Sequence, residues 1–386
     1  MTAIPATFRM FLVVACLTCG SAMSASAQPS SLHTLWRAAL VEPAPTAWKP
    51  REHGGVAVSP SGTYLYAASA AGVKAFVAAT GQPLWDLPTP ERVDSRPVVH
   101  GGVVYAATLA GAVHAVDGRT GRRLWREPAR LESAVQAPLA ADDSHVYVVA
   151  DPGSIAAIGR VTGKPVWRHN AEIIREFLVE GQGGPLAIGG LVYVGLPSGK
   201  LLALAARDGG VTWEVALERG ERSPYADVDS TPVLVPRSGR NAKAKDGGTP
   251  DWLLAASHSG GLFALAAADG GQVWHYDAEA LGQPVVHQGR VYAVSAVGEL
   301  HVVDLETGRR IVARRLGGGA SGTVAVTSAG IALVPTETGL DAVSMWTGRG
   351  VQRSMVEAGF FAAPAVVGDL AYAVSNGGVL YAFALR

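Results

Sequence analysis

The stretch Thr120-Gly121-Arg122-Arg123-Leu124-Trp125 decides the fold, because it is one copy of a motif that recurs along the chain. Close copies read Thr-Gly-Gln-Pro-Leu-Trp at 80–85 and Thr-Gly-Lys-Pro-Val-Trp at 162–167. With looser copies included, turns of this kind begin at Thr80, Thr120, Thr162, Asp208, Asp269, Thr307 and Thr347, at intervals of 40, 42, 46, 61, 38 and 40 residues. Periods of this size are typical of repeat architectures.

Each repeat contains four short strands separated by turn residues. In the second repeat we expect them at 96–100, 103–107, 112–117 and 123–125. The third strand has a period of two, as a half-buried strand does. Gly after Asp or Thr permits the tight turn between the third and fourth strands, because Gly accepts a positive φ. Four antiparallel strands repeated at this spacing predict a β-propeller.

The two ends of the chain predict how many blades the propeller has. Residues 378–384 read as a third strand with no fourth after it, and residues 32–36 read as a fourth strand with no third before it. Pairing them gives an eighth blade and leaves no open sheet edge at the seam. We therefore expect an all-β fold, an eight-bladed β-propeller of four-stranded antiparallel blades closed by the N-terminal strand. The Trp of the motif should fill the space between packed sheets, at Trp36, Trp85, Trp125, Trp167, Trp213 and Trp274.

Residues 1–27 read as a signal peptide rather than as part of the fold. Arg9 supplies a positive charge, residues 10–19 form an apolar run too short to span a bilayer, and Ala25-Ser26-Ala27 is a cleavage site. An alternative is a lipoprotein signal in which Cys16 becomes the lipid-bearing first residue. We expect an exported chain with residues 28–386 as one domain, interrupted by a polar insertion at 236–250 that is interpreted as a solvated loop.

The composition argues against several classes of function. Thirty-two basic and 32 acidic residues cancel, whereas nucleic-acid binders normally carry a basic excess. Both cysteines, Cys16 and Cys19, fall within the signal, so the mature chain offers no thiolate nucleophile, disulfide or cysteine metal site. The ten His are scattered, and the sequence has no P-loop, dinucleotide fingerprint or Gly-x-Ser-x-Gly motif. It therefore predicts no catalytic, cofactor-binding or metal-binding residues.

The repeat resembles the pyrroloquinoline-quinone-like propeller repeat, in which a Tyr in the second strand precedes Gly-hydrophobic-x-Ala-hydrophobic-Asp-x-x-Thr-Gly-x-x-hydrophobic-Trp. Two families carry it: the quinoprotein alcohol dehydrogenases, and the outer-membrane assembly factor BamB, an eight-bladed scaffold that is not an enzyme. Residues 227–232 (Asp-Val-Asp-Ser-Thr-Pro) resemble an Asp-Val-Asp-Thr-Thr-Pro stretch of the BamB family. Residues 177–185 align with a second contact segment of that family, with Glu180 at the position of an Arg.

The resemblance implies a non-enzymatic scaffold that assists the assembly and insertion of outer-membrane β-barrel proteins. Its partner would be the periplasmic domains of a BamA-like assembly barrel. The chain would be monomeric within a larger complex, in the periplasm or at the periplasmic face of the outer membrane. The resemblance implies neither a cofactor nor a nucleic acid. The residues that would contact the partner are Phe177, Leu178, Val179, Glu180, Gly181, Asp227, Val228, Asp229 and Ser230.

Two alternatives stay open. A generic exported propeller that binds another protein or a glycan shares the fold, and Glu180 favours it because a charge reversal would weaken a salt-linked contact. A quinoprotein dehydrogenase would be considerably longer and would carry a vicinal Cys-Cys pair against its cofactor, whereas the mature chain has no cysteine. For a protein-binding propeller, segments 177–183 and 226–231 should lie side by side on one face, with Asp227 and Asp229 at least partly exposed.

Overall fold

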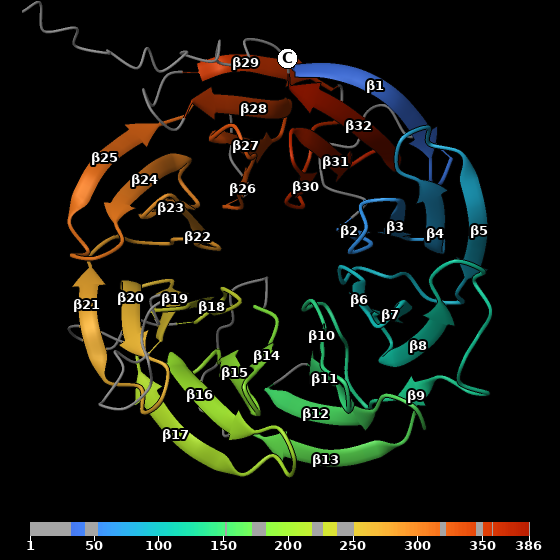
Figure 1. Cartoon of the computed structure of the whole chain (residues 1–386), viewed down its shortest axis with the longest axis horizontal. Coiled ribbons are helices and arrows are strands. Elements are labelled where there is room, and N and C mark those ends of the chain that lie inside the picture. The colour runs from blue at the N-terminus through green and yellow to red at the C-terminus, as the bar shows by residue number, and fades with distance from the viewer. Residues whose placement is uncertain are drawn as a thin grey trace, which may run out of the picture.

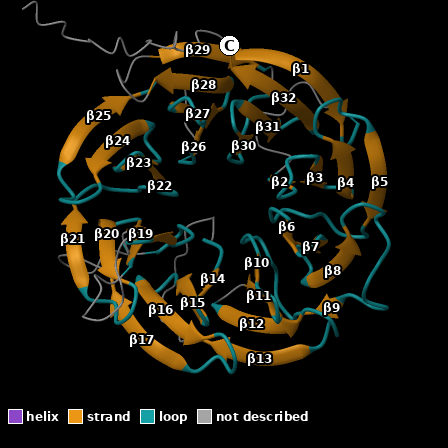
Figure 2. Cartoon of the chain, viewed as in Figure 1, coloured by secondary structure: helices purple, strands orange, loops and turns teal. Residues whose placement is uncertain are grey.

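All regular elements of the described chain are β-strands. The computed structural model describes residues 32–42, 53–150, 153–171, 183–217, 227–237, 251–316, 322–344, 350–356 and 358–385. Within these ranges the strands form eight four-stranded antiparallel sheets arranged as a ring (Figures 1 and 2). The same ranges contain no helix of the length and apolarity needed to cross a membrane. The predicted eight-bladed β-propeller is confirmed.

Seven blades are continuous in sequence. Blade 1 contains β2 (Val56–Val58), β3 (Tyr64–Ser69), β4 (Gly72–Val77) and β5 (Pro83–Pro88). Blade 2 contains β6 (Val98–His100), β7 (Val103–Ala107), β8 (Ala112–Asp117) and β9 (Ala129–Arg130). Blade 3 contains β10 (Ala140–Ala141), β11 (His145–Ala150), β12 (Ser154–Gly159) and β13 (Pro165–Asn170). Blade 4 contains β14 (Leu186–Ile188), β15 (Leu191–Gly195), β16 (Lys200–Ala205) and β17 (Val211–Ala216).

The remaining three continuous blades complete most of the ring. Blade 5 contains β18 (Val233–Val235), β19 (Trp252–Ser257), β20 (Gly261–Ala266) and β21 (Gln272–Tyr276). Blade 6 contains β22 (Val285–His287), β23 (Arg290–Val294), β24 (Glu299–Asp304) and β25 (Arg310–Arg315). Blade 7 contains β26 (Ala325–Val326), β27 (Ile331–Thr336), β28 (Gly339–Ser344) and β29 (Gly350–Met355). In each blade the first strand lies nearest the axis of the ring and the fourth lies at the rim (Figure 1).

The eighth blade joins the two ends of the chain. It contains β30 (Ala365–Val367), β31 (Leu370–Val374), β32 (Val379–Leu385) and, at its outer edge, β1 (Leu32–Ala39). β1 runs antiparallel to β32 from Leu32 opposite Leu385 to Ala39 opposite Val379, with one irregularity between Thr34 and Trp36. The N-terminal strand therefore closes the ring in the way the sequence predicts.

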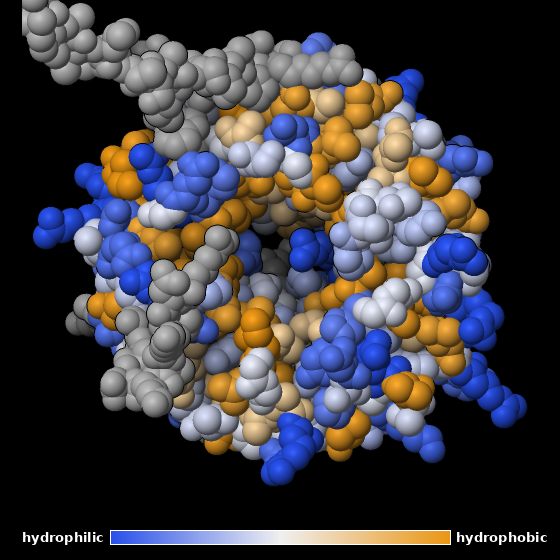
Figure 3. All heavy atoms as spheres, in the orientation of Figure 1, coloured by the Kyte–Doolittle hydropathy of each residue, from blue (hydrophilic) through white to orange (hydrophobic). Residues whose placement is uncertain are grey.

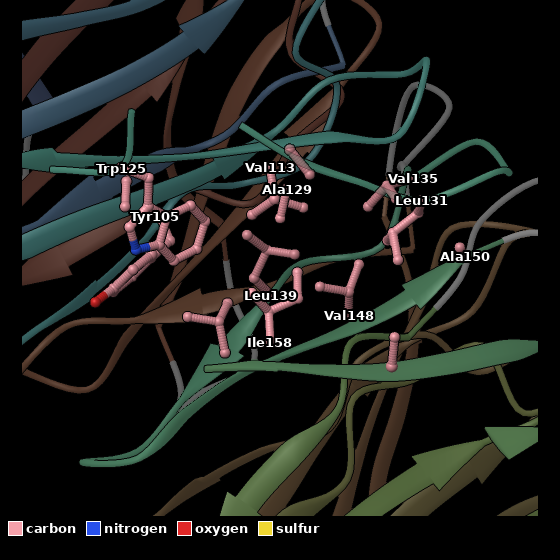
Figure 4. Close-up of a cluster of buried hydrophobic side chains, with 14 residues drawn as sticks. Tyr105, Val113, Trp125, Ala129, Leu131, Val135, Leu139, Val148, Ala150 and Ile158 are labelled. Atoms are coloured by element: carbon pink, nitrogen blue, oxygen red, sulfur yellow. The ribbon is translucent and has the colours of Figure 1, made fainter. Parts of the chain in front are cut away.

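The core lies between neighbouring blades. Eight clusters of buried apolar side chains occur in the described chain, one at each of the eight blade-to-blade interfaces. Figure 4 shows the cluster between blades 2 and 3, where Tyr105 and Trp125 lie with Leu139 and Ile158. The middle strands are buried on both faces, which is why they read as nearly continuous apolar runs.

A Trp connects each of six blades to the next blade of the ring. The ring of Trp85 in blade 1 lies against Gly121 in blade 2, where an added Cβ would approach the indole to 2.7 Å. Gly121 also has a φ of 71°, so both space and backbone conformation require glycine there. The indole N–H of Trp85 donates to the Gly118 carbonyl at 3.0 Å. Equivalent bonds of 2.8–3.2 Å are donated by Trp36, Trp125, Trp167, Trp213 and Trp274.

Two interfaces lack this Trp. In blade 6 the position holds Val312, whose side chain remains 36% exposed. In blade 7 it holds Gln352, whose Oε1 accepts a hydrogen bond of 2.5 Å from the Leu32 N–H at the start of β1. The closing strand is thus joined to blade 7 by a polar contact where other blades use an indole.

Candidate functional site

The Asp-Val-Asp-Ser-Thr-Pro segment leads into β18 and lies between two hairpins. The Val228 N–H donates to the Leu196 carbonyl at 3.1 Å, in the β15–β16 hairpin of blade 4. The His258 N–H donates to the Asp227 carbonyl at 2.8 Å, from the β19–β20 hairpin of blade 5. The backbone of the segment is therefore fixed from both sides, and its position belongs to the rigid part of the ring.

Ser230 and Thr231 attach this segment to the sheets around it. The buried Ser230 hydroxyl accepts a hydrogen bond from the Ala256 N–H at 2.8 Å and lies 3.2 Å from the Ala256 carbonyl. Thr231 donates its N–H to Gln283 Oε1, and Gln283 Nε2 donates back to the Thr231 carbonyl, both at 2.8 Å. Gln283 belongs to blade 6, so this amide pair connects blades 5 and 6.

The end of the second predicted segment lies directly beside Thr231. The Gly184 N–H donates to Thr231 Oγ1 at 2.7 Å. An added Cβ on Gly183 would come within 2.4 Å of the Ser230 carbonyl group, so only glycine permits this approach. The end of this segment therefore meets the Asp-Val-Asp-Ser-Thr-Pro segment at residues 183–184 and 230–231, and the placement of 177–182 beside it stays a prediction. Phe177, Leu178, Val179, Glu180 and Gly181 lie outside the described residues.

The burial of the acidic residues differs from the sequence expectation. Asp227 is only 1% exposed and Val228 is 2% exposed, so the expectation that both Asp side chains reach solvent is wrong for Asp227. Asp227 is buried because its segment is hydrogen-bonded between the β15–β16 and β19–β20 hairpins. Asp229 is half-buried, and this burial, together with the charge of Asp227, raises its pKa to about 8. Asp229 is therefore largely uncharged at neutral pH.

Blade 2 carries a second copy of this segment, which the sequence analysis missed. Residues 92–97 read Arg-Val-Asp-Ser-Arg-Pro, against Asp-Val-Asp-Ser-Thr-Pro at 227–232. The backbone bonds correspond: the Val93 N–H donates to the Ser69 carbonyl at 3.1 Å, and the Leu109 N–H to the Arg92 carbonyl at 2.8 Å. Recurrence of Val-Asp-Ser-x-Pro-Val after 135 residues was the available signal. Most of the motif therefore serves the fold.

The two copies differ in charge. In blade 2, Arg92 Nε donates to Asp94 Oδ1 at 2.7 Å, and His53 Nδ1 lies 3.9 Å from the same carboxylate. In blade 5 the position of Arg92 is taken by Asp227, so Asp229 faces a second acid instead of a cation. This exchange gives the blade 5 copy an electrostatic character that the fold itself does not need.

The neck of the polar insertion is clamped rather than free. Arg237 stacks on Trp252 with its guanidinium 3.9 Å from the ring centroid and forms a two-point ion pair with Glu306 of blade 6, 2.6 Å at Nη2. Its N–H donates to Asp251 Oδ1 at 2.9 Å. Placing Arg237 in a solvated loop was therefore wrong, because Trp252 and Glu306 provide a stacking surface and an anion. Residues 238–250 lie outside the described residues.

The described residues contain no group of three or more His, Cys, Asp or Glu side chains that could hold a metal ion. Figure 3 shows a narrow opening at the centre of the ring with hydrophilic side chains beside it. The side chain of Arg96 runs along Gly55 of blade 1, within 3.0 Å of where a Cβ on that glycine would lie.

Sequence comparison matches the chain to a family model and to curated proteins, BamB proteins among them. A family model described as outer membrane protein assembly factor BamB matches residues 27–136 and 72–311. BamB of Yersinia pestis is 26% identical over 351 residues, which cover 83% of this chain and 82% of that protein. The match to BamB of Nitrosomonas eutropha spans about half of that relative, 49% of its length.

Solved structures show the same fold. The crystal structure of BamB from Moraxella catarrhalis superposes with a TM-score of 0.76 at 20% identity, covering 92% of this chain and 100% of that one. The quinohemoprotein alcohol dehydrogenase of Comamonas testosteroni superposes with a TM-score of 0.70 at 16% identity, covering 93% of this chain and 77% of that one. At these identities the likeness concerns the fold alone.

Proposed function

Because the chain belongs to the family of the outer membrane protein assembly factor BamB, we propose that it is an exported, non-enzymatic scaffold in the assembly of outer-membrane β-barrel proteins. In this role the propeller binds a protein partner, the periplasmic domains of a BamA-like barrel. Its fixed ring of blades suits such a role, because binding segments held on a rigid scaffold lose little conformational entropy on binding.

The partner surface is centred where residues 183–185 meet residues 227–231. The hydrogen bond between Gly184 and Thr231 carries this proposal, since it brings two segments 47 residues apart to one place on the ring. Asp227, Val228 and Ser230 are buried, so they position the segment rather than touch the partner. Asp229 and Thr231 are half-buried and are the residues within reach of a partner. The segment 177–181 would extend the surface, with Glu180 requiring a cation on the partner.

A capture experiment with two matched variants tests this surface. Asp229→Arg places a cation at the proposed centre, and Asp94→Arg makes the same change at the corresponding position of blade 2. Asp94→Arg also removes the ion pair with Arg92, so it should destabilise the fold at least as much as Asp229→Arg and controls for a general loss of stability. We expect Asp229→Arg to weaken binding of purified BamA periplasmic domains at least tenfold, while Asp94→Arg binds like the wild type. Equal loss in both variants, or wild-type binding by Asp229→Arg, would overturn the site.

Because the chain shares its fold with a quinohemoprotein alcohol dehydrogenase, a quinone-dependent dehydrogenase is the alternative function to test. If the chain were such an enzyme, the resemblance would imply a vicinal cysteine pair beside a bound quinone. Here the two cysteines are Cys16 and Cys19, both before the first described strand. The residues present therefore do not fit the quinone site, and we assign no reaction to the ring.

A further inference from the structure

The outer strand of blade 2 departs from the pattern of the other blades. In blade 1, Val73 pairs with Leu87, two residues after Trp85. In blade 2 the equivalent Val113 pairs with Ala129, four residues after Trp125. Two additional residues therefore leave the ladder around Glu127, and β9 is reduced to Ala129–Arg130. In blades 1 and 3 to 7 the third and fourth strands stay paired through a single one-residue register shift. The two-residue departure is therefore particular to blade 2 among these sheets, and bulges are enriched at sheet edges and beside active sites.

The same stretch concentrates positive charge. Between residues 117 and 130 five exposed arginines accompany two acids, a net charge of +3 in a chain whose total is zero. We call this set the basic rim: Arg119, Arg122, Arg123, Arg126 and Arg130. One of the two acids, Asp117, is occupied by its own turn, because its carboxylate accepts hydrogen bonds from the Thr120 N–H and hydroxyl at 2.8 and 2.7 Å.

No ion pair neutralises these guanidiniums within the described chain, whose salt bridges all involve other cations. The positive charges of the basic rim also act on a buried side chain, His114. His114 on β8 is buried, and its Nε2 has no hydrogen-bond partner among the described residues. Burial lowers the pKa of His114, and the charges of Arg123 and Arg130 lower it further. The basic rim is thus a surface of net positive charge whose guanidiniums form no salt bridge among the described residues.

Protection of a sheet edge is the simpler explanation for charged rim residues. β25 on blade 6, opposite blade 2 in the ring, shows what that alone requires: it carries Arg310, Arg314 and Arg315 on a six-residue strand with only the one-residue register shift of the other blades. Blade 2 adds the bulge, which moves Arg126 out of the ladder and lengthens the cationic strip. Leu124 beside these arginines is 38% exposed, as is the equivalent residue of other blades, for example Leu84 at 39%. Edge protection does not call for these additions.

From these observations we propose that the basic rim of blade 2 binds the phosphate headgroups of an anionic membrane surface. The strip follows the convex outer edge of the disc, where hydrophilic side chains project over β8 and β9 (Figure 3), so it can meet an extended surface. Guanidinium groups match the geometry of phosphate oxygens, and each basic residue near an anionic surface favours binding. Leu124 adds apolar contact at the headgroup boundary. The site lies two blades from blade 4 and three from blade 5, which carry the proposed partner surface, and it is independent of that surface.

Vesicle flotation of the full chain tests the proposal. Every protein carries Cys16→Ser, so that an acyl chain cannot account for binding. We expect the protein to float with vesicles of phosphatidylglycerol and phosphatidylcholine but not with vesicles of phosphatidylcholine alone. High salt should release it from the anionic vesicles. The variant R123Q/R126Q/R130Q should lower vesicle partitioning about 100-fold. All three side chains are exposed, so the fold should tolerate the changes.

A matched control separates a site from general attraction. The variant R309Q/R314Q/R315Q removes the same charge at the rim of blade 6, where all three side chains are also exposed. It should retain binding within about fivefold of the unmutated rim. Equal loss in both triple variants would overturn the proposal, as would no flotation with anionic vesicles. Binding to soluble polyphosphate without any flotation would also overturn it and would identify a dissolved polyanion as the ligand.

Discussion

Removing one interblade Trp should cost far more than removing the residue that replaces it at the next interface. Trp274 of blade 5 is 7% exposed, donates its indole N–H to the Leu305 carbonyl at 2.8 Å and covers Gly308. Trp274→Ala should lower the free energy of unfolding by about 3–5 kcal/mol, the usual cost of emptying an aromatic site. Trp274→Phe keeps a ring but leaves the Leu305 carbonyl without its donor, for a loss of about 1–2 kcal/mol.

The matched change is Val312→Ala, at the same strand position one blade later. Because Val312 is 36% exposed, its truncation should cost less than about 1 kcal/mol. Urea unfolding followed by circular dichroism gives all three values, with an unchanged m-value as the check that the same transition is measured. The reasoning is refuted if Val312→Ala costs as much as Trp274→Ala, or if Trp274→Ala costs under 1 kcal/mol. Either result would mean that blade contacts other than the indole hold the ring.

Three further predictions concern closure, protonation and catalysis. Deleting residues 28–40 removes β1 and exposes the edge of β32, so the thermal midpoint should fall well below that of the intact ring; an unchanged midpoint would contradict closure by β1. Because Asp229 has a pKa raised to about 8, its contribution to stability is complete below pH ~4 and is lost as the pH rises through ~8. Asp229→Asn has no such group, so the wild type should lose about 2–4 kcal/mol of unfolding free energy relative to this variant between pH 5 and pH 8. A difference between the two proteins that stays constant with pH would rule out the raised pKa. Protein supplied with pyrroloquinoline quinone and Ca²⁺ should reduce dye with alcohol no faster than a protein-free control, and measurable turnover would restore the dehydrogenase alternative.

The architecture was readable from the sequence because its determinants are local and repeated. The Thr-Gly turn and the following Trp mark each third-to-fourth strand connection, and the Gly121 contact with Trp85 explains why the two recur together. The seam was predictable for a different reason: an unpaired third strand and an unpaired fourth strand stand at opposite ends of the chain. Periodicity thus encodes both the blade and the number of blades.

The site was less readable because its burial depends on distant residues. Asp227 looks like an exposed turn residue, yet the hairpins at Leu196 and His258 enclose it. The sequence around Asp227 does not predict these contacts, because each hairpin belongs to a different part of the chain. Arg237 was misassigned in the same way, because Glu306 lies 69 residues further along. The repeat could have shown one missed feature, since aligning Asp229 with Asp94 reveals the structural part of the motif.

The pairing of β1 with β32 also sets an order of events during synthesis. β1 ends at Ala39, and the strand with which it forms a ladder in the described sheets, β32, ends at Leu385. At a synthesis rate of about 5–20 residues per second, the first strand waits roughly 20–70 s for its neighbour. Throughout that interval the edge of β1 that pairs with β32 has no native partner. A chain that stops early cannot pair this edge, so an incomplete molecule exposes an unpaired N-terminal strand that chaperones and proteases can recognise.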